Sequence, residues 1–141
     1  MKPFKNTPNK PKIIAIDDSP MLINFLGNFL SKEYDVTTYM STSEALKDLS
    51  EGKVQPDFIL TDYYLGNDLT GLEFIQALKK VDPIIPVLVL SGSVDMHQKI
   101  ECLKNGAVDF VSKPFNPMEL DARIKNTLSV SPQLNQYRHA V

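Results

Sequence analysis

Five short strand-like segments alternate with five amphipathic helical stretches along this chain, and this alternation is the strongest constraint on its fold. The predicted strands cover residues 12–16, 35–39, 58–60, 87–90 and 107–111, and the helices that follow them begin near Pro20, Ser43, Gly71, Asp95 and Pro117. Strands joined by helices pair in parallel, with right-handed crossovers and helices on both faces of the sheet. We therefore expect an α/β fold, a three-layer, doubly wound (βα)5 sandwich around a five-stranded parallel sheet.

Capping residues and apolar spacing predict where the helices begin and which side chains they bury. Ser19 before Pro20, and Thr70 before Gly71, are typical N-cap signals, and we expect Ser43 or Thr42 to cap the second helix. Apolar residues at helical spacing are predicted to face the core: Leu22, Phe25, Leu26 and Phe29 in the first helix, Leu72, Ile75 and Leu78 in the third, Met96, Ile100 and Leu103 in the fourth, and Leu120, Ile124 and Leu128 in the fifth.

The length, net charge, apolar runs and cysteine count of the chain limit the classes of function that it can have. The 141 residues suffice for one domain, and a net charge of −2 argues against a general nucleic-acid binder. No apolar run reaches the ~20 residues that span a bilayer, and one cysteine, Cys102, rules out an internal disulfide and is interpreted as a half-buried helical residue. We expect a cytoplasmic protein with a flexible basic arm at residues 1–11, a domain at 12–129 and a tail at 130–141.

Polar residues end four of the five predicted strands. Asp17 and Asp18 follow the first strand, Asp62 ends the third, Ser91 ends the fourth and Lys113 follows the fifth. In a doubly wound sheet the first and third strands flank a crevice at the carboxyl edge, so the three acids are predicted to share it. Carboxylates this close repel one another, and a hard divalent cation such as Mg²⁺ relieves that repulsion.

In these residues the chain resembles a response-regulator receiver domain of two-component phosphorelays. The resemblance runs from about Lys12 to Leu128 and is especially close in the segment Gly106-Ala-Val-Asp-Phe-Val-Ser-Lys-Pro-Phe115. It implies the flavodoxin-like, CheY-like strand order 2-1-3-4-5. It also implies a sensor histidine kinase or a histidine phosphotransfer protein as phosphodonor, and a downstream protein partner rather than a nucleic acid or a membrane.

The resemblance assigns a role to each polar strand end. Asp62 would be the phosphoacceptor, with autophosphorylation and autodephosphorylation as its only catalysis. Asp18, Asp62 and the Tyr64 carbonyl would bind Mg²⁺ directly, and Asp17 would act mostly through a metal-bound water. Lys113 would neutralise phosphoryl oxygens.

The remaining family positions concern switching. Ser91 would donate its hydroxyl to the phosphoryl group, Phe110 stands at the switch aromatic, and Lys113-Pro114 is expected to be a cis peptide. Tyr64 is expected to screen the acyl phosphate from water, and Gly92 to leave room for the donor.

Four charges match those that some family members pair across a homodimer of the fourth helix, fifth strand and fifth helix: Lys99, Asp109, Glu119 and Arg123.

The same residues fit some other functions less well. A phosphatase using an aspartyl phosphate resembles an Asp-x-Asp pattern, but Tyr64 stands where the second acid would be. A flavin module needs a phosphate cradle after the first strand, where Asp17 and Asp18 would repel phosphate. A degenerate receiver used only for docking stays open, as does the receiver portion of a longer regulator. Since no output domain follows Leu128 in this sequence, a single-domain regulator is the expectation.

Overall fold

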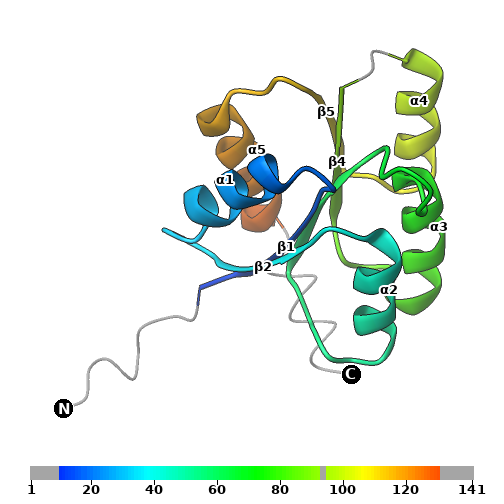
Figure 1. Ribbon diagram of the computed structural model, residues 1–141, viewed down its shortest axis with the longest axis horizontal. Helices are drawn as coiled ribbons and strands as arrows, with labels where there is room; N and C mark the ends of the chain where they lie inside the picture. Colours follow the sequence, from blue (N-terminus) through cyan, green and yellow to red (C-terminus); the bar gives the residue numbers. More distant parts are fainter. Residues whose placement is uncertain (1–9, 93–94, 131–141) are drawn as a thin grey trace.

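The computed structural model describes residues 10–92 and 95–130 of the chain, so most of the expected arm and tail lie outside the described residues. The strands are β1 (Lys12–Ile16), β2 (Asp35–Tyr39), β3 (Phe58–Asp62), β4 (Val87–Ser91) and β5 (Asp109–Ser112). The helices are α1 (Pro20–Leu30), α2 (Thr42–Ser50), α3 (Gly71–Val81), α4 (Met96–Lys104) and α5 (Pro117–Val130) (Figure 1). Within these residues, no helix has the length and apolar character needed to cross a membrane.

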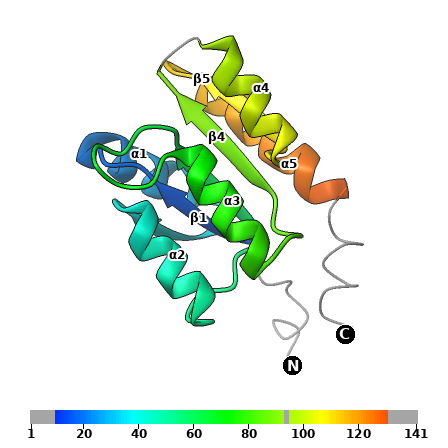
Figure 2. The ribbon, with the colours of Figure 1, turned by 90° about the vertical axis from the view of Figure 1, so that its right-hand side faces the viewer.

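The strands form one parallel sheet in the order β2-β1-β3-β4-β5, which confirms the predicted topology. Helices α1 and α5 cover one face, and α2, α3 and α4 cover the other (Figures 1 and 2). Every residue of β3 and β4 is buried, as expected for central strands covered on both faces, whereas β2 at the edge is largely exposed. All five strands point the same way, so their carboxyl ends meet at one edge.

Two apolar clusters form the core, one on each side of the sheet, because successive strand residues point to opposite faces. The cluster under α1 and α5 includes Ile13, Ala15, Phe58, Leu60, Leu88, Leu90, Ile23, Leu26, Leu30, Leu120 and Ile124. The cluster under α2, α3 and α4 includes Ile14, Ile16, Ile59, Val87, Val89, Ala45, Leu49, Phe74, Ile75, Leu78, Cys102 and Phe110.

The predicted inner face of α1 was partly wrong. Leu26 is buried, and Leu22 and Phe29 are partly buried, but Phe25 is 42% exposed and stacks on Phe29 with ring centroids 5.7 Å apart. Ile23 and Leu30 complete the buried stripe with Leu26, at spacings of three and four residues.

The predicted inner face of α4 was wrong. Met96, Ile100 and Leu103 are 61%, 44% and 41% exposed, and the buried residue of this helix is Cys102, which was expected to be only half-buried. Consecutive residues of a helix differ by about 100°, so Ile100 lies about 200° from Cys102 around the axis. The apolar stripe of Met96, Ile100 and Leu103 faces away from the sheet, and the side that meets the sheet carries Cys102.

Two element boundaries also differ from the prediction. Ser41, rather than Ser43 or Thr42, caps α2, because its hydroxyl accepts a hydrogen bond from the Glu44 N–H at 3.1 Å. The fifth strand begins at Asp109 rather than at residue 107, since the Ala107 N–H still bonds to the Cys102 carbonyl at 2.9 Å and closes the turn after α4. The caps predicted at Ser19 and Thr70 are confirmed, the latter as a capping box with Glu73.

Candidate functional site

Three acidic side chains meet at the carboxyl edge of the sheet. Asp17 and Asp18 follow β1 and Asp62 ends β3, and one carboxylate oxygen from each lies within 4.8 Å of the others. Asp17 is 1% exposed and Asp62 7%, whereas Asp18 is exposed to solvent. The parallel pairing of β1 with β3 brings the acids together across more than forty residues of sequence, as the strand order predicts.

Backbone N–H groups fix the two buried acids. Asp17 Oδ1 accepts from the Ser19 N–H at 2.9 Å, at the start of α1. Asp62 Oδ1 accepts from the Tyr63 N–H, also at 2.9 Å. Each carboxylate therefore keeps a second oxygen for other partners.

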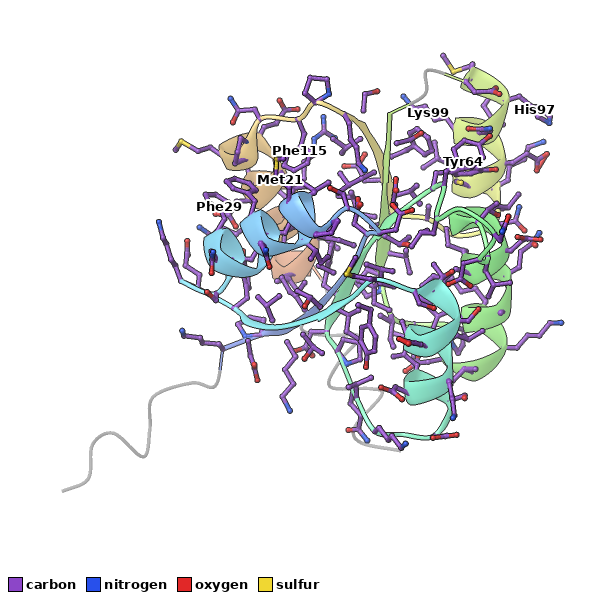
Figure 3. All side chains as sticks on the ribbon, viewed as in Figure 1. Met21, Phe29, Tyr64, His97, Lys99 and Phe115 are labelled. Carbon is purple, nitrogen blue, oxygen red and sulfur yellow. The ribbon has the colours of Figure 1, made fainter. Side chains whose placement is uncertain are left out.

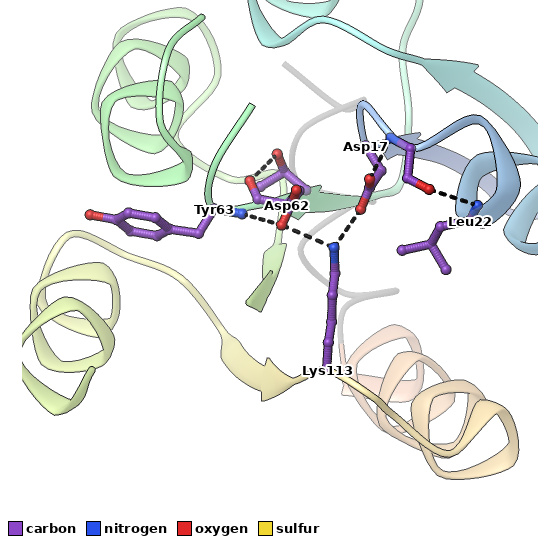
Figure 4. A network of polar contacts seen from close by, with 7 residues as sticks. Asp17, Leu22, Asp62, Tyr63 and Lys113 are labelled. Carbon is purple, nitrogen blue, oxygen red and sulfur yellow. Dashed lines mark hydrogen bonds and ion pairs between the residues drawn. The ribbon is translucent and has the colours of Figure 1, made fainter. Parts of the chain in front are cut away.

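Lys113 bridges the two buried acids from the end of β5 (Figure 4). Its Nζ lies 2.7 Å from Asp17 Oδ2 and 3.1 Å from Asp62 Oδ1. The Lys113 N–H donates to the Ser91 carbonyl at 2.7 Å, which anchors the residue to β4, and its peptide bond to Pro114 is cis. The ammonium thus lies where negative charge is densest.

The charges of the site shift the pKa values of its groups. Burial, reinforced by the Asp17 charge, raises the pKa of Asp62 above its ordinary value, although Lys113 and the Tyr63 N–H oppose the shift. Burial lowers the pKa of Lys113, but the hydrogen bond to Asp17 and the charges of both acids outweigh it, so the net pKa is raised and the ammonium stays charged. One lysine against three acids leaves the site negative.

The three acids fit a Mg²⁺ ion. Opposite ligands of an octahedral Mg²⁺ site lie about 4.2 Å apart, twice the Mg–O distance. One oxygen each of Asp17, Asp18 and Asp62 lies within 4.8 Å of the others, slightly wider than that span, and all three residues offer oxygen donors, which is the chemistry that Mg²⁺ prefers. The exposure of Asp18 leaves a side of the cluster open to solvent and to further ligands.

The other predicted site residues lie around this cluster. Ser91 is buried at the end of β4, and Phe110 is 8% exposed in β5, packed into the core under α2, α3 and α4. Among the residues that the structure describes, a Cβ added to Gly92 would meet no atom within 4 Å, so space is open there beside Ser91. Tyr64 is 53% exposed and its hydroxyl accepts a hydrogen bond from Gln98 of α4.

Helix α3 begins directly behind Asp62. The Gly71 N–H donates to the Tyr63 carbonyl at 2.8 Å. A Cβ at Gly71 would lie 3.2 Å from both the Asp62 carbonyl oxygen and Tyr63 Cα, so the helix approaches the strand end this closely only because residue 71 has no side chain.

Asp68 is a functional-site neighbour that the sequence did not reveal. Its carboxylate accepts hydrogen bonds from the Ser41 and Ser43 hydroxyls, from the Ser43 N–H and from the Leu69 N–H at 2.8 Å. These bonds tie the loop after Asp62 to the start of α2. Burial alone would raise the pKa of Asp68, but the hydrogen bonds from Ser41 and Ser43 outweigh it and lower the pKa well below its usual range.

The charges suggested for a dimer are mostly paired within the chain. Arg123 Nη1 lies 2.7 Å from Asp109 Oδ2, and its Nη2 lies 3.0 Å from Glu119 Oε2. Lys99 is exposed on α4.

Comparison with known proteins places this geometry in a family. The model of the response regulator receiver domain matches residues 13–125. The chain is 35% identical over 118 residues to the alkaline phosphatase synthesis transcriptional regulatory protein PhoP of Bacillus subtilis, covering 83% of the chain and 48% of that protein. It is 32% identical over 128 residues to the hybrid signal transduction histidine kinase D of Dictyostelium discoideum, covering 89% of the chain and 8% of that kinase. The chain therefore spans less than half the length of each of these relatives.

Solved structures show the same fold. The BeF3-activated DrrB receiver domain is 28% identical with a TM-score of 0.77, and the alignment covers 85% of this chain and 98% of that one. A CheY-like receiver domain from Methanospirillum hungatei has a TM-score of 0.83 at 21% identity, covering 89% of this chain and 98% of that one.

Proposed function

The chain belongs to the response regulator receiver domain family, and from this premise we propose that it accepts a phosphoryl group on Asp62. The observation that carries the proposal is the junction of three acids and one lysine at the carboxyl edge of the sheet, with Lys113 in contact with both buried acids. We assign this function to residues 12–129, which include the whole of the matched range 13–125.

The transfer is a displacement at phosphorus. One carboxylate oxygen of Asp62 forms a bond to phosphorus while the bond from phosphorus to the donor nitrogen of a phosphohistidine breaks. The histidine nitrogen leaves with the electron pair of that bond. The Lys113 ammonium, 3.1 Å from Asp62 Oδ1, is placed to stabilise the negative charge on the transferring oxygens.

Asp17, Asp18 and Asp62 would hold Mg²⁺, with the Tyr64 carbonyl as a further ligand. Bound there, the ion would neutralise phosphoryl charge that Lys113 alone does not balance. The Ser91 hydroxyl would hydrogen-bond to a phosphoryl oxygen, and Phe110 would respond through its packing beneath α4.

The signal would pass from a histidine kinase or a phosphotransfer protein to a protein partner at the surface of α4, β5 and α5, in the cytoplasm. A homodimer through that surface would require Arg123 to exchange Asp109 and Glu119 of its own chain for those of a second copy. Catalysis would be confined to the gain and loss of the phosphoryl group on Asp62.

Labelling with acetyl phosphate tests the proposal. With Mg²⁺ present, the intact mass should rise by one phosphoryl group, and the gain should vanish in Asp62→Asn or when a chelator removes the metal. Asp35→Asn, which changes an exposed acid at the opposite edge of the sheet, is the matched control and should label normally. Label retained in Asp62→Asn would overturn the assignment, and no label in the folded parent would favour a receiver used only for docking.

A further inference from the structure

A hydrogen bond joins the loop after Asp62 to α4. Tyr64 stands two residues after Asp62, and its hydroxyl accepts a hydrogen bond from Gln98 Nε2 on α4. The Tyr64 ring also meets the Tyr63 ring edge-on, with centroids 4.8 Å apart and an interplanar angle of 73°. Two contacts therefore hold a side chain that is otherwise half exposed.

The two ends of this hydrogen bond are anchored very differently. On the loop side, Asp68, four residues after Tyr64, accepts hydrogen bonds from the Ser41 and Ser43 hydroxyls at the start of α2, which anchors the loop that carries Tyr64. On the helix side, Cys102 is the buried residue of α4, and most of the helix's apolar surface faces solvent. A helix with so little buried area is a low-stability element of the fold.

The side-chain amide of Gln98 also lacks part of its hydrogen bonding. Its Oε1 is buried and has no hydrogen-bond partner among the residues that the structure describes. An unpaired buried amide oxygen offsets part of what the bond to Tyr64 contributes. The contact therefore holds α4 only weakly, and a small displacement of the helix would break it.

We propose that Gln98 is a positioning residue for the phosphorylation site, which acts by holding the Tyr64 side chain, two residues after Asp62, and so couples the position of α4 to the lifetime of the aspartyl phosphate. The second half of this proposal rests on the function proposed above, whereas the Tyr64–Gln98 coupling does not. A ring held by Gln98 and Tyr63 shields the acyl phosphate steadily, and a released ring spends time in solvent and admits water. A displacement of α4 that breaks the Tyr64–Gln98 bond therefore shortens the lifetime of the aspartyl phosphate.

The coupling is tested first without phosphate or metal. Tyr64→Phe removes only the hydroxyl and should speed amide hydrogen exchange in α4 by about threefold, the effect of one modest hydrogen bond. Tyr39→Phe is the matched control, because it removes a hydroxyl that bonds to Asp48 at 2.7 Å, away from α4. If α4 exchanges its amide hydrogens at the same rate in the parent and in Tyr64→Phe, the coupling is overturned. That result does not depend on whether Asp62 is the phosphoacceptor.

The half-life of the aspartyl phosphate is then measured after labelling with acetyl phosphate. Tyr64→Phe and Gln98→Ala should each shorten the half-life by about threefold, and the double variant should match the single ones, because both remove the same bond. Figure 3 shows His97 on the outer side of α4, so His97→Ala should decay like the parent. Gln98→Glu, whose carboxylate can accept from the Tyr64 hydroxyl, should recover most of the lifetime.

The proposed function and the positioning role of Gln98 would fail in different experiments. Label that survives in Asp62→Asn contradicts the proposed function. If Asp62 is labelled but Gln98→Ala keeps the parental half-life, only the positioning role of Gln98 is contradicted. The same holds if the effects of the two substitutions multiply in the double variant.

Discussion

Lys113 Nζ lies 2.7 Å from Asp17 Oδ2, although 96 residues separate the two in the chain. The lysine also contacts Asp62, at 3.1 Å from its Oδ1. Lys113 would therefore have two opposing effects on the proposed site, because it offsets the acids in the absence of a cation and would weaken the binding of a cation to them.

Replacing Lys113 separates these effects. Lys113→Met should slow labelling by acetyl phosphate at least about tenfold, as expected for the loss of one charge that stabilises the transition state. The same variant should bind Mg²⁺ more tightly, because a positive charge beside the ion is gone. Calorimetric titration with Mg²⁺ measures the second effect, and Lys104→Met, an exposed lysine on α4, is the control. Weaker Mg²⁺ binding in Lys113→Met would contradict this account of the site.

The raised pKa of Asp62 makes its charge a cost to the metal-free fold. An acid whose pKa is higher in the folded state contributes stability below its unfolded value of 3.8, and that contribution is lost as pH rises through the folded value. Without metal, Asp62→Asn should therefore raise the free energy of unfolding at pH 7 by about 1 kcal/mol. The gain should shrink as pH falls toward 4, which urea denaturation at several pH values would measure. A gain that is the same at every pH would refute the electrostatic explanation.

Asp68 should stabilise the fold at neutral pH. Asp68→Ala removes an acceptor for Ser41, Ser43 and Leu69, and should lower the free energy of unfolding by about 1–3 kcal/mol. Because its pKa is lowered in the folded state, this contribution is present above the ordinary value of 3.8 and is lost as pH falls below it. Urea denaturation tests this, with the exposed neighbour as control in Asn67→Ala. Equal losses at pH 7 and at pH 2–3 would show that charge is not the cause.

Two phenylalanines should differ in what they contribute. Phe110 is 8% exposed and Phe25 is 42% exposed. Phe110→Ala should cost about 3–5 kcal/mol through the cavity that it leaves, and Phe25→Ala about 1 kcal/mol or less, since it loses only its stacking on Phe29. Equilibrium unfolding in urea measures both, and a larger loss at Phe25 would mean that α1 is turned differently.

The parts of the molecule that follow from local rules could be predicted from the sequence. Parallel strands place their carboxyl ends together, so Asp17 and Asp62 could be assigned to one edge before any coordinates. The inner face of α4 could not be assigned, because its apolar spacing (Met96, Ile100, Leu103) marks a face that lies in solvent, whereas the buried Cys102 has no apolar neighbour at helical spacing before it. Nor could the bonds from Asp68 to Ser41 be predicted, since loop partners 27 residues apart are chosen by tertiary packing.

Helix α3 packs directly against the end of β3 at Gly71. The first turn of α3 rests against the main chain of Asp62, with no side chain between them and no free space into which the strand end could withdraw. The side of Asp62 that its ion pair opens toward is that of Lys113. The bulk of an acyl phosphate on Asp62 would therefore press on the loops at the carboxyl edge of the sheet, since α3 blocks the retreat of the main chain behind it.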